Sequence, residues 1–127
     1  ENGYLKCDDN QTRWQGEYQK LGSATRIIIC SKSGIGDVTI ALNNGKTLHI
    51  ESKKFKSGSG GEYPAMREAI GQLMTGCPDD VNTILVVAVP FNSKSFELSK
   101  KWSCNKRIQN AGIHFMLVYP NGNIEFI

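Results

Sequence analysis

The sequence predicts an α/β fold in which a central mixed β-sheet is flanked by helices, within a single domain over residues 1–127. Two apolar runs rich in β-branched residues, 25–30 and 83–89, are typical of strands buried on both faces. Stretches with helical spacing of apolar residues alternate with such runs, which implies crossover connections that are right-handed where strands are parallel. A chain of 127 residues with 39% hydrophobic content can bury one core. The start at Glu1 rather than Met suggests either a chain trimmed after a tag or a domain excised from a longer protein.

The first predicted element is a short helix over residues 12–21, which Gly22 ends. Its apolar residues repeat at i, i+4 and i+7 and form one stripe: Trp14, Tyr18 and Leu21. Glu17, the acidic residue of this stretch, is open to two interpretations. It pairs with Arg13 or Lys20 on the surface, or it lies close to a functional site.

A β-hairpin is predicted next, because residues 38–42 and 47–53 alternate apolar and polar side chains around Asn44-Gly45, a strong turn signal. Side chains along a strand point to opposite faces in turn. One face is apolar and carries Val38, Ile40, Leu42, Leu48 and Ile50. The opposite face, which we expect not to feed the core, carries Asp37, Glu51 and Lys53.

A helix is predicted over residues 63–74, where Pro64 suits the first turn. Its apolar stripe consists of Met66, Ile70, Leu73 and Met74. Glu68 and Gln72 are four apart and project from a common face, although a solvated surface is the simpler interpretation for Glu68. Gly71 weakens a helix, which predicts a close approach of this turn to the sheet.

The rest of the chain completes the α/β pattern. The expected elements are a central strand at 83–89 ending at Pro90, a helix at 95–110 closed by Gly112, and strands at 113–119 and 123–127. The helix at 95–110 has a basic face made of Lys100, Lys101, Lys106 and Arg107.

The charged face of the hairpin indicates a chemistry. Carboxylates suit hard ions such as Mg²⁺, which usually takes one or two protein carboxylates and keeps several waters. Residues two apart on a strand are about 6.6 Å apart, so Glu51 can hold an ion while Lys53 reaches the water or phosphate beside it. Lys53 would orient or deprotonate the water, or neutralise the transition state. The simpler interpretation is a solvated Glu51–Lys53 pair on an amphipathic strand.

Three motifs follow one another in this region: Gly-x-Gly-Asp over 34–37, Ile-Glu-Ser-Lys over 50–53 and Ala-x-Gly-Gln-Leu over 69–73. Their order resembles the PD-(D/E)XK nuclease superfamily across roughly residues 13–90. The resemblance implies a restriction-endonuclease-like core with the element order α-β-β-β-α-β.

The resemblance also implies roles for individual residues. Asp37 matches the metal-binding Asp of the motif, and Glu51 and Lys53 match its (D/E)XK half. Gly36 stands where the motif often has a Pro without catalytic role. By the same resemblance the metal ligands are Asp37, Glu51, the carbonyl of Ser52 and Glu17, and Gln72 contacts the attacking water or a phosphate.

These roles imply a Mg²⁺- or Mn²⁺-dependent endonuclease that hydrolyses phosphodiester bonds, with DNA favoured over RNA as its partner. Two alternatives remain open: a metal-dependent ribonuclease of the toxin type, and a catalytically silent nucleic-acid-binding module of the same fold. A homodimer or a partner subunit is compatible with cutting both strands.

Composition excludes several other classes. No stretch approaches the ~20 apolar residues of a membrane span, and no signal peptide is recognisable. The four cysteines lack Cys-x-x-Cys or zinc spacing, which favours free thiols in a cytoplasmic protein. His49 and His114 lie in predicted strands, and no Gly-x-Ser-x-Gly signature is present. A net charge of +3 permits a polyanionic partner without requiring one.

Overall fold

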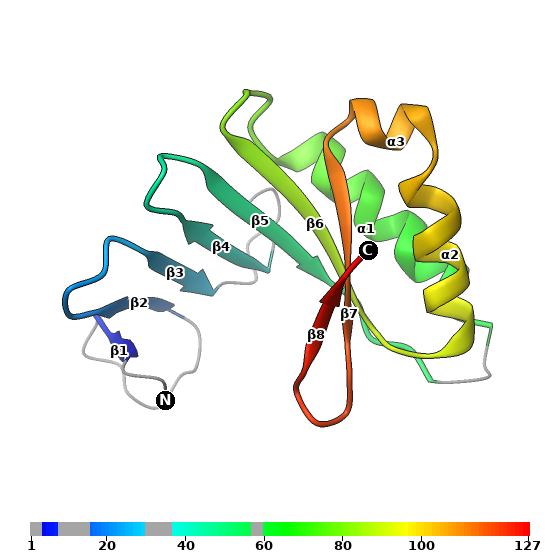
Figure 1. The fold of residues 1–127 in the computed structure, drawn as a ribbon, viewed down its shortest axis with the longest axis horizontal. Helices are drawn as coiled ribbons and strands as arrows, with labels where there is room; N and C mark the ends of the chain where they lie inside the picture. Colours follow the sequence, from blue (N-terminus) through cyan, green and yellow to red (C-terminus); the bar gives the residue numbers. More distant parts are fainter. Residues whose placement is uncertain (1–3, 8–15, 30–36, 57–59) are drawn as a thin grey trace.

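The computed structural model describes residues 4–7, 16–29, 37–56 and 60–127. Within them the chain is an α/β protein with one open mixed sheet of eight strands and three helices (Figure 1). The strands are β1 (Tyr4–Lys6), β2 (Gly16–Lys20), β3 (Arg26–Ile29), β4 (Val38–Ala41), β5 (Thr47–Ser52), β6 (Thr83–Pro90), β7 (Ile113–Val118) and β8 (Ile124–Phe126). The helices are α1 (Glu62–Gly76), α2 (Ser93–Ser103) and α3 (Lys106–Asn110). None of the described helices is long and apolar enough to cross a membrane.

The sheet keeps the order of the sequence, so each strand pairs with its neighbours along the chain. Strands β1 to β5 form an antiparallel meander, β5, β6 and β7 are parallel, and β8 returns antiparallel to β7. The two parallel connections contain the helices, as crossovers between parallel strands require. In Figure 1 the helices lie together against β5, β6 and β7, while β1 to β4 extend away from them.

The predicted hairpin between β4 and β5 is confirmed. Gly45 has a φ of +80°, the left-handed conformation that the turn requires and that glycine adopts without steric cost. The amide of Leu42 donates to the carbonyl of Lys46 at 2.8 Å, and the side chain of Asn44 accepts from the Lys46 amide at 3.0 Å. These bonds fix the register in which Val38 lies opposite Ile50.

All three helices cover the same face of the sheet. Side chains of α1 and α2 meet alternate residues of the two central strands in one buried cluster: Met66, Ala69, Leu73, Leu85, Val87, Val89, Leu98, Ile113, Phe115 and Leu117. A smaller apolar cluster occupies the other face, around Ile50, Val86, Ala88 and Met116. The predicted central strand at 83–89 is confirmed, since β6 is buried through most of its length.

Glu51 lies on the helix-covered face, because its register partner Val87 belongs to the larger cluster. The expectation that the charged face of the hairpin does not feed the core was therefore wrong. The strand alternation was correct, but the apolar face of β5 meets the smaller cluster while its polar face turns toward α1. Sequence alternation reveals two faces and does not say which of them a helix will cover.

The predicted helix over 12–21 was wrong where the structure describes it. Residues 16–20 form β2, which pairs with both β1 and β3, and Leu21 is fully exposed. Ladder pairing with two neighbours outweighed the weak helical pattern. The first element of the expected α-β-β-β-α-β order, as far as it is described, is consequently a strand.

Two further expectations need correction. Strand β3 is half-buried rather than buried on both faces. The helix expected at 95–110 is divided into α2 and α3, because the side chain of Asn105 accepts from the amides of Arg107 and Ile108 and thereby caps a new helix.

Gly71 does not approach the sheet. It lies exposed on α1, and a Cβ placed there would meet no other atom within 4 Å. The predicted reason for this glycine was wrong.

Gly45 and Gly71 provide a matched pair for a stability test, since a Cβ at either position meets open space. We expect Gly45→Ala to lower the free energy of unfolding by about 1 kcal/mol, because alanine is strained at positive φ. Gly71→Ala should raise it by about 0.5–1 kcal/mol through helix propensity. Urea unfolding followed by circular dichroism measures both, and equal effects of the two substitutions would contradict the described backbone.

Candidate functional site

Asp37 lies beside Glu51 at the open end of the β4–β5 hairpin, opposite the turn at Gly45. The ladder pairs Val38 with Ile50, so the next residues outward in register are Asp37 and Glu51. Opposed residues of antiparallel strands have Cβ atoms about 4.5–5.5 Å apart. The Oδ2 atom of Asp37 accepts a 2.8 Å hydrogen bond from the backbone amide of Ser52, which fixes this carboxylate across the end of the hairpin.

The carboxyl group of Glu51 is unusual in being buried close to another carboxylate. The residue is 8% exposed, and α1 contacts β5 on its side of the sheet. Burial and the charge of Asp37 raise the pKa of Glu51 above its ordinary value, against the opposing effect of Lys53. A cation placed between the two carboxylates would relieve both unfavourable effects.

Lys53 connects the hairpin to α1. Its Nζ lies 3.3 Å from Oε1 of Glu51 and 3.1 Å from Oε1 of Glu68. Burial would lower the pKa of Lys53, but hydrogen bonds to Glu68 and Glu51 outweigh it, and the net shift is upward. Its backbone amide donates to the carbonyl of Ala88 at 3.0 Å, so the main chain is anchored to β6. Lys53 is thus held as an ammonium ion, which favours charge neutralisation over deprotonation of a water.

Glu68 is a site residue that sequence reasoning placed on the solvated surface. The side chain is 61% exposed, yet one carboxylate oxygen contacts Lys53. The sequence signal that could have found it is the order of strand and helix: α1 crosses back over β5, and this face of α1 meets the end of that strand. A single exposed glutamate on a helix carries no such information by itself.

The structure does not bring Glu17 to this cluster. Glu17 lies on β2, in register with Ile28 of β3 and, through it, with Thr39 and His49. That places it three strands from β5, about 14 Å away at 4.8 Å per strand. Its Oε1 instead contacts Nε of Arg26 at 2.7 Å. Glu17 thus forms a surface ion pair, as one of the two interpretations expected, but with Arg26; Arg13 lies outside the described residues.

Gln72 and His49 flank the cluster in different ways. Gln72 is exposed on α1, one turn after Glu68 and on the same side. His49 shares the face of Glu51 but is only 5% exposed, and its Nδ1 lies 3.3 Å from Oγ1 of Thr39. His49 is therefore a core histidine.

The donor set of this cluster fits a small hard cation. Within the described residues, no three His, Cys, Asp or Glu side chains converge as a metal-binding group. Mg²⁺ commonly needs only one or two protein carboxylates, because water completes its shell. Asp37 and Glu51 are such a pair, and the amide of Ser52 already orients one of them. The Lys53 ammonium supplies one positive charge against the carboxylates of Glu51 and Glu68, and Asp37 adds a third negative charge.

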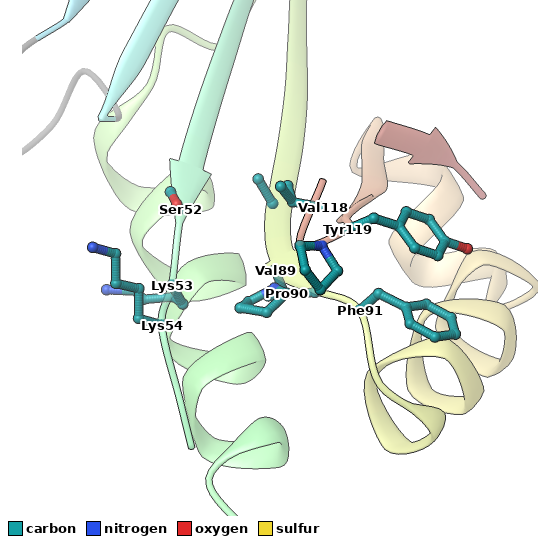
Figure 2. Close-up of a pocket in the computed structure, with 10 residues that line it drawn as sticks. Ser52, Lys53, Lys54, Val89, Pro90, Phe91, Val118 and Tyr119 are labelled. Atoms are coloured by element: carbon teal, nitrogen blue, oxygen red, sulfur yellow. The ribbon is translucent and has the colours of Figure 1, made fainter. Parts of the chain in front are cut away.

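A cavity of about 290 Å³ opens at the carboxyl ends of the three parallel strands, where Ala88 and Val118 of the helix-free face line it. Ligands of open α/β sheets commonly bind at this edge. Lys53 belongs both to the cavity lining and to the carboxylate cluster. Figure 2 shows the two lysines on one side of the cavity, Pro90 between, and the rings of Phe91 and Tyr119 on the far side.

Comparison with protein-family models, with curated proteins and with solved structures found no match. The resemblance to a nuclease superfamily therefore stays a prediction from the sequence motifs.

The raised pKa of Glu51 leads to a prediction for stability against pH. The folded state favours the protonated carboxyl of Glu51, because its pKa is raised there. The resulting contribution to the free energy of unfolding is present below pH 4.5, the ordinary pKa, and is lost as pH rises through the raised pKa. Glu51→Gln keeps a neutral side chain at every pH. We expect the unfolding free energy of the variant, relative to wild type, to increase from about pH 4 to about pH 8.

Chemical unfolding of both proteins at a series of pH values without divalent ions measures this difference. Glu97→Gln, at an exposed position of α2, serves as the matched control. A relative stability of Glu51→Gln that falls as pH rises would contradict the burial of this carboxyl beside Asp37.

Proposed function

We propose that the protein is a metal-dependent endonuclease that hydrolyses phosphodiester bonds in DNA, built on a core of the restriction-endonuclease type. The observation that carries the proposal is the pairing of the Asp37 and Glu51 carboxylates at the end of the hairpin, with the Lys53 ammonium beside them. The order from β3 to β6 also supports it, because three antiparallel strands, a helix and a parallel strand correspond to the β-β-β-α-β part of the expected core.

Each residue of the cluster has a defined task under this proposal. Asp37 and Glu51 would hold Mg²⁺ or Mn²⁺, and the bound ion would acidify a water and stabilise charge on the phosphoryl oxygens. Lys53 would neutralise a non-bridging oxygen of the phosphodiester as its charge increases in the transition state. Glu68 acts as a positioning residue, because its contact at 3.1 Å holds the ammonium toward the end of β5.

The charge around the site favours a polyanionic substrate. Lys53 is followed by Lys54 and Lys56, both exposed, as the chain leaves β5. Contacts of lysines with phosphates are largely independent of base sequence, so this segment would supply affinity and leave specificity to other contacts.

One observation favours a second candidate, a catalytically silent nucleic-acid-binding module. Lys53 contacts Glu51 directly, so an internal ammonium already neutralises part of the charge that a metal ion would neutralise. Binding of nucleic acid without cleavage in the presence of Mg²⁺ and Mn²⁺ would support this module and contradict the nuclease.

Substitutions in the cluster test the proposal. Asp37→Asn, Glu51→Gln and Lys53→Ala should each reduce cleavage on the order of 100-fold or more, because the first two remove a charge that would hold the metal ion and the third removes the charge that would neutralise the phosphate. Asp37→Asn retains an oxygen that can accept from the Ser52 amide, so its fold should persist. Glu17→Gln is the matched control, since Glu17 lies on the same face three strands away, and it should cleave at the wild-type rate.

The measurement is a parallel digest of plasmid, single-stranded DNA and tRNA with Mg²⁺, Mn²⁺ or EDTA, with circular dichroism of each variant. We expect DNA cleavage with either metal and none in EDTA. Cleavage by Asp37→Asn at the wild-type rate would contradict the proposed metal site. Cleavage confined to tRNA would show that the substrate is RNA.

A further inference from the structure

The cavity at the ends of β5, β6 and β7 has a lining unlike that of the carboxylate cluster. Ten described residues line it, and none of them is acidic: Ser52, Lys53, Lys54, Ala88, Val89, Pro90, Phe91, Val118, Tyr119 and Pro120. Its volume of about 290 Å³ lies near the lower end of small-molecule sites, about 300–1,000 Å³. The cavity therefore suits a small and largely apolar group that is attached to an anion.

The apolar part of the lining is held in place by the fold. Ala88 is 3% exposed on β6, and Val118 pairs in register with Pro90. The rings of Phe91 and Tyr119 stack with centroids 4.5 Å apart and planes 15° apart, and the Phe91 amide donates to the Val118 carbonyl at 2.9 Å. A cavity lined by paired strand ends is preformed, so a ligand would enter it without ordering the protein first.

The charged part of the lining comes from one side. Lys53 and Lys54 lie across the cavity from the aromatic pair, with Pro90 between (Figure 2). Ala88 of the lining lies on the helix-free face, whereas the Lys53 ammonium contacts Glu51 on the helix-covered face. Lys53 therefore connects the cavity to the carboxylate cluster around the carboxyl end of β5. An anion bound at the two lysines would hold an apolar group that is bonded to it at the cavity mouth.

We propose that this cavity binds an unstacked nucleobase whose own phosphate lies against Lys53 and Lys54. A nucleobase is flat, its faces stack on apolar and aromatic side chains, and its sugar carries the required anion. A base paired within a duplex cannot enter such a cavity without leaving the stack. The inference rests on the proposed nuclease function and deepens it: the substrate is nucleic acid that is single-stranded, or unpaired at the nucleotide next to the cut.

The test uses the whole chain in EDTA, so that neither metal nor cleavage is involved. Nuclear magnetic resonance titrations compare adenosine 5′-monophosphate with ribose 5-phosphate, which has the sugar and phosphate but no base. We expect the nucleotide to bind about tenfold more tightly, the ratio that about 1.4 kcal/mol of stacking provides. The methyl resonances of Val118 should shift with the nucleotide and not with the sugar phosphate.

Two alanine-to-leucine substitutions serve as a matched pair. Ala88→Leu should remove the preference for the nucleotide by filling the cavity, whereas Ala41→Leu, on β4 and outside the cavity, should retain it. If Ala88→Leu does not fold, the test rests on the wild-type protein: the Val118 methyl resonances must shift with the nucleotide and not with ribose 5-phosphate. Equal affinity for the two ligands, or nucleotide-induced shifts confined to residues away from the cavity, would overturn the proposal.

These outcomes are separable from the fate of the nuclease. Base-dependent nucleotide binding in a protein that never cleaves nucleic acid would refute the endonuclease proposal and support the cavity as a nucleobase site. Metal-dependent cleavage by a protein without base-dependent binding would refute the cavity and leave the endonuclease.

Discussion

The register of the β4–β5 hairpin is the constraint on which the site depends. The turn at Gly45 sets Val38 opposite Ile50, and that pairing alone determines that Asp37 meets Glu51. A shift by one residue would turn Glu51 to the other face of the sheet and separate the two carboxylates. The apolar residues of both strands resist such a shift, because they fill the smaller cluster on the helix-free face. The same residues that stabilise the hairpin therefore position the acidic pair.

Helix α1 makes this pair part of a partly buried charged cluster. It packs against β5, where Glu51 is buried, and it supplies Glu68, whose carboxylate lies 3.1 Å from the Lys53 ammonium. Burial also extends to Cys77 at the end of α1, where desolvation and the charge of Glu51 raise the pKa of the thiol. Buried like charges are costly unless they are compensated. The cluster has one ammonium among three carboxylates, which is why a further cation is the simplest account of its composition.

The sequence was sufficient for features that local rules control. The Asn44-Gly45 turn, the alternation around it and the continuous apolar run of β6 indicated the hairpin and the central strand, and the structure confirms them. It was insufficient where partners far along the chain decide. Residues 16–20 became β2 because two strands pair with them, and the contact of Glu68 depends on how α1 crosses β5. The motif residues at 34–36 lie outside the described residues.

Isothermal titration calorimetry with Mg²⁺ and Mn²⁺ tests the central claim most directly, because it asks whether Asp37 and Glu51 share one ion without requiring a substrate. The account predicts one binding site in the wild-type protein, loss of binding in Asp37→Asn and in Glu51→Gln, and unchanged binding in Glu17→Gln. Absence of measurable heat in the wild-type protein, or equal binding by all four proteins, would contradict the claim that these carboxylates form a metal site.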